Sequence, residues 1–165
     1  MHIYRADLRD LTACLTLDGS YETECVWQVV QQQEGEDVTA RFRVVQLPRA
    51  VRVRYPNWSE ALLAHQERGD MILVAAQAGD VWGYIDQEMQ RDQDIAWVHH
   101  LVVAPAYRRQ GLTRAVLLEG LRRLKARGME RACVSTQVNN TPARRLYESV
   151  GFQIVNQTLD YVQGE

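Results

Sequence analysis

The sequence has few cysteines, no long apolar run and almost no net charge. Its three cysteines, Cys14, Cys25 and Cys133, form no CxxC pair, so neither a disulfide framework nor a zinc site is indicated and buried apolar thiols are expected. No stretch approaches the length of a membrane span, and the first residues have no signal-peptide core. A formal net charge of −2 gives no reason to expect nucleic acid as a partner. These absences favour a cytoplasmic protein without a nucleic-acid, membrane or metal partner.

What is present is an ordinary globular composition. Charged residues make up 24% and hydrophobic residues 46% of the 165-residue chain, which is long enough to bury a sizeable core. There is no internal repeat and no low-complexity tail. We therefore predict one domain over residues 1–165, present as a monomer or a homodimer.

The most informative stretch begins at Ile95. Residues 95–104 are almost continuously apolar and rich in valine, which is typical of a strand buried on both faces. Pro105 ends this strand because proline cannot donate to a ladder. A basic, glycine-containing turn then leads into a long helix. The turn and helix start are Arg108, Arg109, Gln110, Gly111, Leu112 and Thr113. The first N–H groups of a helix lack partners and glycine lets a phosphate approach the main chain, so this unit predicts an anion site.

Two motifs in this region have a specific spacing. Arg108-x-x-Gly111-x-Thr113 after the strand resembles the acetyl-CoA signature of the GNAT superfamily of N-acetyltransferases, with Thr113 where a glycine or alanine is usual. Residues 140–152 resemble the later motif of the same family, Asn-x-x-Ala-x-x-x-Tyr-x-x-x-Gly-Phe. Because both motifs occur in the right order and at the right distance, the chain is identified as a member of this superfamily.

The resemblance implies a fold and a cofactor site. The fold is α/β, with a central mixed and mostly antiparallel sheet flanked by helices. By resemblance, the turn 108–113 holds the pyrophosphate of acetyl-CoA, and pantetheine pairs with the main chain of Leu101, Val102 and Val103. Main-chain N–H groups near Val103 are expected to contact the thioester carbonyl. Asn140 matches the position that binds CoA or begins a helix, and a plain capping role remains an alternative.

The same resemblance suggests the catalytic residues. Tyr147 matches the general acid near the CoA sulfur, and a phenol, with an unperturbed pKa of about 10, can protonate a thiolate. His99 matches the strand position of a catalytic histidine in arylalkylamine acetyltransferases, and imidazole suits proton transfer near neutrality. His99 and His100 are adjacent, so we expect them on opposite faces of the strand. His100, a carboxylate of Asp86 or Glu88, or a water chain remain alternatives for the base.

The remaining elements follow from periodicity and turn residues. The predicted strands are 2–6, 71–78, 81–90 and 132–138, and the predicted helices are 7–17, 58–68, one from Gly111 to Gly128 and one from Pro142 to Gly151. An inserted β-hairpin is predicted near 25–47, with Pro48 ending its second strand. Residues 152–162 predict one more strand or a broken pair.

The acceptor is the least defined part of the function. Residues 17–29 resemble the corresponding segment of streptothricin (nourseothricin) acetyltransferases, and Asp18, Glu22 and Glu24 form an acidic run there that suits a cationic amine. The main hypothesis is acetyl transfer from acetyl-CoA to a primary amine of a small cationic molecule. A protein N-terminal or lysine acetyltransferase and a non-catalytic acyl-CoA-binding module are the alternatives.

Overall fold

The structure is a computed structural model that describes residues 1–54 and 59–155. Over these residues it contains a five-stranded sheet in the order β1-β4-β5-β6-β7. Its strands are β1 (His2–Arg5), β4 (Met71–Gln77), β5 (Asp80–Gln90), β6 (Ile95–Val103) and β7 (Arg131–Val134). All neighbours are antiparallel except β6 and β7, which are parallel. The predicted mixed and mostly antiparallel sheet is therefore confirmed.

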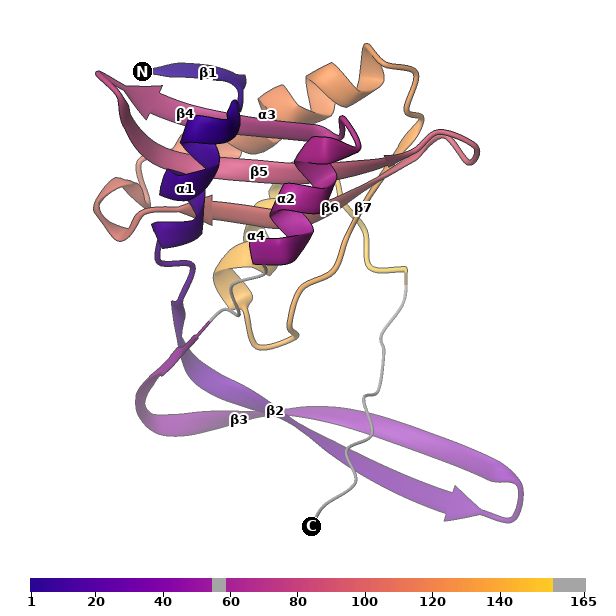
Figure 1. The fold of residues 1–165 in the computed structure, drawn as a ribbon. Helices are drawn as coiled ribbons and strands as arrows, with labels where there is room; N and C mark the ends of the chain where they lie inside the picture. The colour runs from indigo at the N-terminus through magenta and orange to yellow at the C-terminus, as the bar shows by residue number, and fades with distance from the viewer. Residues whose placement is uncertain (55–58, 156–165) are drawn as a thin grey trace.

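Helices cover both faces of this sheet (Figure 1). Helices α1 (Leu8–Thr16) and α2 (Ser59–Glu67) lie on one face, and α3 (Leu112–Lys125) lies on the other. The short 3-10 helix η1 (Pro105–Tyr107) precedes α3, and α4 (Thr141–Ser149) follows β7. The residues 55–58, which include the predicted start of the second helix, lie outside the described residues.

Each face of the sheet has its own core. On the α3 face, Leu117 and Val116 pack on Leu73, Ile85 and Val98. The second cluster, on the α1/α2 face, consists of Ala6, Leu11, Cys14, Leu62, Ile72, Val74, Tyr84 and Val102. Alternate residues of β4 and β6 therefore belong to different cores, which agrees with strands buried on both faces.

The inserted hairpin is longer than predicted. It comprises β2 (Tyr21–Glu34) and β3 (Asp37–Val53), forms a separate two-stranded sheet and projects away from the core (Figure 1). Pro48 does not end β3. The pairing with β2 passes from Cys25–Gln46 to Thr23–Val51, and Pro48 belongs to the intervening residues 47–50 of β3, which have no paired residue on β2. A residue that makes no ladder contact tolerates the missing N–H of proline.

Two strands predicted toward the C-terminus differ from those in the structure. β7 covers Arg131–Val134 and is shorter than the predicted 132–138. Residues 152–155 form no strand, and the rest of the predicted last strand lies outside the described residues. In the described part of the chain, none of the helices is long and apolar enough to cross a membrane.

The cysteines differ from one another in burial. Cys14 is 1% exposed within the α1/α2 core, whereas Cys25 and Cys133 are only half-buried, so the expectation of buried thiols holds for Cys14 alone. Burial raises the pKa of the Cys14 thiol to about 12.

Cys14 is therefore expected to resist alkylation. With iodoacetamide at pH 8, the folded protein should be labelled at Cys25 and Cys133 and not at Cys14, because the thiolate is the nucleophile and Cys14 is both protonated and covered. Peptide mass spectrometry before and after unfolding in guanidinium measures this. Labelling of Cys14 in the folded protein as fast as that of Cys25 would contradict the burial of this helix face.

Candidate active site

A β-bulge reorients the two adjacent histidines of β6. Asp86 of β5 pairs with His100, but the next residue, Gln87, pairs with Val98, so His99 is an extra residue without a counterpart on β5. Val98 lies on the α3 face and Val102 on the α1/α2 face, and the extra residue places both His99 and His100 on the α1/α2 face. The expectation that they point to opposite faces is wrong, because strict alternation holds only in a regular strand.

Asp86 binds two histidines at once. Its Oδ2 lies 2.7 Å from Nδ1 of His65, on α2, and 3.0 Å from Nδ1 of His100. Burial alone raises the pKa of Asp86, but the hydrogen bonds from His100 and His65 outweigh it and hold the pKa below its usual value. The hydrogen bond to Asp86 raises the pKa of His65. Because Asp86 is fully buried and shared in this way, it positions imidazoles and is not itself placed to accept a proton from an amine.

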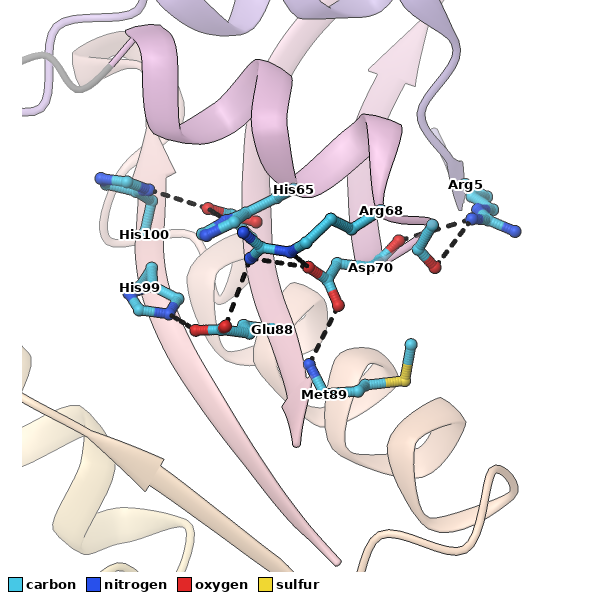
Figure 2. Close-up of polar contacts among 10 residues, drawn as sticks. Arg5, His65, Arg68, Asp70, Glu88, Met89, His99 and His100 are labelled. Carbon is cyan, nitrogen blue, oxygen red and sulfur yellow. Dashed lines mark hydrogen bonds and ion pairs between the residues drawn. The ribbon is translucent and has the colours of Figure 1, made fainter. Parts of the chain in front are cut away.

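Glu88 and His99 form a second, more accessible pair (Figure 2). His99 Nε2 lies 2.8 Å from Glu88 Oε2, with side-chain exposures of 37% and 28%. Arg68, which follows α2, bridges Glu88 at 3.2 Å and Asp70 at 3.0 Å. Asp70 in turn accepts the main-chain N–H of Met89 at 3.1 Å. This chain of contacts fixes Glu88 beside the exposed imidazole, so His99 is the histidine of this strand that an acceptor from solvent can reach.

The second half of β6 has an open edge. β7 pairs with β6 only between Ile95 and Val98, so Leu101, Val102 and Val103 have no strand partner on that side within the described residues. An unpaired edge offers main-chain N–H and C=O groups to an extended ligand. This is the segment for which the sequence predicts pantetheine binding, and the geometry leaves room for such pairing.

The turn after β6 is held from several sides. Tyr107 stacks on Trp82 of β5 with ring centroids 4.2 Å apart. The guanidinium of Arg108 donates to the carbonyl oxygens of Val103 at 2.8 Å, Ser20 at 2.7 Å and Asp18. Arg108 therefore joins the end of β6 to the loop after α1, and in this structure its donors are used within the protein.

The turn residues that follow present main chain and not side chain. Gly111 has a left-handed conformation at φ +81° and is the N-cap of α3, with no side-chain hydrogen bond at the cap. Nothing lies within 4 Å of the position that a Cβ at Gly111 would take. Arg109, also at positive φ, and Gln110 are exposed beside it. The first turn of α3 thus begins without a side-chain cap at the positive end of the helix, beside a glycine that leaves open space, which is the arrangement an anion needs.

Helix α4 places the predicted general acid. Asn140 is its N-cap and accepts the N–H of Ala143 at 3.3 Å, so the capping role expected as an alternative is present. Tyr147 is half-buried against the α3-face core, and its ring contacts Phe152 edge-on with centroids 5.6 Å apart. Tyr147 and His99 therefore belong to opposite faces of the sheet.

The acidic run does not stay together as a site. Asp18 forms an ion pair with Arg52 and accepts the N–H of Ser20 at 2.9 Å. Glu22 and Glu24 are exposed on the hairpin strand β2. Asp18 is thus occupied within the protein, and the carboxylates that the structure gathers near the candidate site are Asp70, Asp86 and Glu88.

Sequence reasoning missed His65 and Arg68. His65 lies in the last turn of α2, 21 residues before Asp86, and Arg68 directly follows that helix. His65 is buried, and the available signal in the sequence was its spacing of three residues from Leu62, which places both on one side of the helix. Only the packing of α2 on the sheet identifies its partner.

The fold and motifs agree with the comparisons to known proteins. Residues 35–152 match the model of the acetyltransferase (GNAT) family, and the chain belongs to this family. Among solved structures, nourseothricin acetyltransferase superposes with a TM-score of 0.75 at 22% identity, over 93% of this chain and 84% of that one.

Two curated relatives differ in how much they share. The ribosomal protein bS18-alanine N-acetyltransferase of Escherichia coli strain K12 is 30% identical over 125 residues, which is 74% of this chain and 79% of the relative. A mycothiol acetyltransferase of Segniliparus rotundus is 32% identical over 83 residues, which is 50% of this chain. The chain spans only 31% of that relative's length, so the likeness concerns one part of it.

Proposed function

We propose that this protein transfers the acetyl group of acetyl-CoA to a primary amine of a small cationic molecule. The observation that supports this most is the open edge at Leu101–Val103, followed by the start of α3 at Gly111, where nothing lies within 4 Å of the position of a Cβ. This edge lies between a histidine on one face and a tyrosine on the other. The pyrophosphate would bind at the turn 108–113 and pantetheine along the edge, which brings the thioester to the middle of β6.

The reaction then needs two proton transfers. The amine nitrogen attacks the thioester carbonyl carbon, a C–N bond forms and the C–S bond breaks. His99, oriented by Glu88, takes the proton that the amine loses, and Tyr147 gives a proton to the departing CoA sulfur. N–H groups of the main chain near Val103 stabilise the oxyanion of the tetrahedral intermediate.

A cationic acceptor suits the charges around His99. Asp70, Asp86 and Glu88 contribute three carboxylates and Arg68 one guanidinium, so the group is negative when the imidazoles are neutral. A second positive group of the acceptor would be attracted to this face, while the reacting nitrogen is deprotonated. The likeness to nourseothricin acetyltransferase supports an antibiotic of the streptothricin class as one such acceptor.

The amino terminus of a protein is the second candidate acceptor. It is favoured by the 30% identity with the bS18-alanine N-acetyltransferase of Escherichia coli, which extends over 74% of this chain. An α-amine is also a primary amine, so the same residues would act on it.

An acceptor panel tests the proposal. Purified protein is mixed with acetyl-CoA and either small di- and polyamines, streptothricin, matched monoamines, or peptides with a free amino terminus. We expect thiol release above the amine-free rate with the small polycationic amines, and a mass increase of one acetyl group on the amine. Thiol release with the peptides alone would replace the proposal by the second candidate. If none of the amines or peptides raised thiol release above the amine-free rate, a non-catalytic binding module would be favoured.

A further inference from the structure

Three potential metal ligands converge on the α1/α2 face of the sheet. They are His65 of α2, Glu88 of β5 and His99 of β6, and one ligand atom from each lies within 4.8 Å of the others. His99 Nε2 and Glu88 Oε2 are already 2.8 Å apart. We propose that these three residues form a zinc-binding site, and that bound zinc inhibits acetyl transfer by occupying His99. The inhibition rests on the proposed function, whereas the binding does not.

Other residues hold two of the ligands in place. His65 Nδ1 is bound to Asp86 Oδ2 at 2.7 Å, which leaves the other ring nitrogen to face away from Asp86. Glu88 Oε1 is bound to Arg68 at 3.2 Å, so Oε2 is the oxygen directed to His99 (Figure 2). Carboxylates that orient a histidine, and hydrogen bonds that orient a carboxylate, are the usual support of a metal ligand set. This support distinguishes the trio from a chance group of exposed side chains.

The donor atoms indicate the kind of metal. Two imidazole nitrogens and one carboxylate oxygen suit zinc, which binds such ligands at about 2.0–2.2 Å and leaves a fourth position for water. Magnesium and calcium prefer oxygen ligands only. In tetrahedral zinc sites neighbouring ligand atoms lie about 3.3 Å apart. The three ligand atoms, which lie within 4.8 Å of one another, must therefore move closer together when zinc binds. The partly exposed side chains of Glu88 and His99 can do so by rotating toward the buried His65.

The local charge also favours a dication. The trio and its neighbours together carry three carboxylates, of Glu88 in the trio and of Asp70 and Asp86 beside it, against the single guanidinium of Arg68. With neutral imidazoles, zinc would bring the charge of this group close to zero. Arg68 does not need to leave, because it contacts the glutamate oxygen that is not directed to His99.

Metal binding is measured first, without any assay of activity. Protein dialysed against a chelator is titrated with zinc by calorimetry at pH 7.5, and the cobalt form is recorded by visible absorption. We expect one zinc per chain, with at least about tenfold weaker binding in His99→Ala and in Glu88→Gln, since ligand loss exceeds the effect of losing a supporting contact. His2→Ala, which removes an exposed histidine of β1, should bind zinc like the wild type. Unchanged affinity in both His99→Ala and Glu88→Gln would overturn the site.

Imidazole resonances identify the ligands directly. The chain has four histidines, so ring-nitrogen spectra of ¹⁵N-histidine-labelled protein resolve each of them. Zinc should shift the signals of His65 and His99 strongly, and those of His2 least. This measurement does not require a His65 variant, which would remove a buried side chain and could prevent folding. Strong shifts confined to His2 would assign the bound zinc to the surface.

The inhibitory consequence is tested on the amine that the acceptor panel identifies. Zinc at a concentration that saturates the site in calorimetry should lower the rate at least about tenfold, and excess chelator should restore it. His2→Ala should be inhibited like the wild type. Full activity with the site saturated would overturn the inhibitory role while leaving the binding site in place, and a lack of activity with every amine would bear on the proposed function alone.

Discussion

Replacement of Tyr147 by phenylalanine is expected to lower kcat by about a hundredfold or more, with little change in the affinity for acetyl-CoA. The phenol acts only when charge develops on the sulfur, so its loss raises the energy of the transition state and not that of the bound complex. Steady-state rates with the best amine of the panel and calorimetry with acetyl-CoA measure the two quantities separately. The ring itself is kept, so its contacts with Phe152 and the α3-face core remain.

Tyr4 supplies the matched control. The hydroxyl of Tyr4, on β1, donates to Asp10 of α1 at 3.0 Å. Tyr4→Phe removes this hydrogen bond and changes no residue of β6 or α4. Its kcat should equal that of the wild type. A Tyr147→Phe enzyme with the same kcat would show that Tyr147 is only a packing residue.

Replacement of Gly111 by tryptophan is expected to abolish acetyl-CoA binding while the domain stays folded. The protein leaves open space where the new side chain would begin, so the indole would occupy the position proposed for the pyrophosphate and would not collide with the core. The left-handed φ of +81° costs a residue with a Cβ about 1–2 kcal/mol, which a domain of this size withstands. Calorimetry with acetyl-CoA and thermal unfolding measure binding and stability.

Gly128 provides a control with the same backbone strain. It lies just beyond the other end of α3 at φ +86°, and it too has nothing within 4 Å of the position of a Cβ. Gly128→Trp should lose similar stability and keep acetyl-CoA binding. Equal loss of binding in both variants would point to strain in α3, and normal binding in Gly111→Trp would place the cofactor elsewhere.

Local sequence was sufficient for the elements that build the proposed cofactor site. The apolar run and Pro105 set the end of β6 almost to the residue, since strand burial and the missing N–H of proline are properties of the segment itself. Gly111 was correctly expected at the helix start, because few other residues adopt its conformation. Asn140 begins α4 for a similarly local reason, which is the side-chain cap.

Local sequence did not reveal the partners that Arg108 and Asp18 have within the protein. The turn that contains Arg108 was expected to hold phosphate and Asp18 to belong to an acidic run that suits a cationic amine, and the structure adds that Arg108 donates to the carbonyls of Ser20 and Asp18, about 90 residues earlier in the chain. Asp18 is paired with Arg52 of the hairpin. Such partners depend on how the loop after α1 packs against the end of β6, and the residues on either side of Arg108 contain no information on that packing.

The sequence by itself determined the family, the order of the elements and the residue types available for chemistry, because motifs, caps and turn residues act within a few positions. The tertiary structure alone decided which of those residues meet. The bulge at His99 arises from the register between β5 and β6, and it brings His99 and His100 to one face although they are neighbours in the chain. The contact of His65 with Asp86 needs α2 to pack on that same face. Register and packing are set by burial summed over the whole sheet, and no single stretch of sequence specifies them.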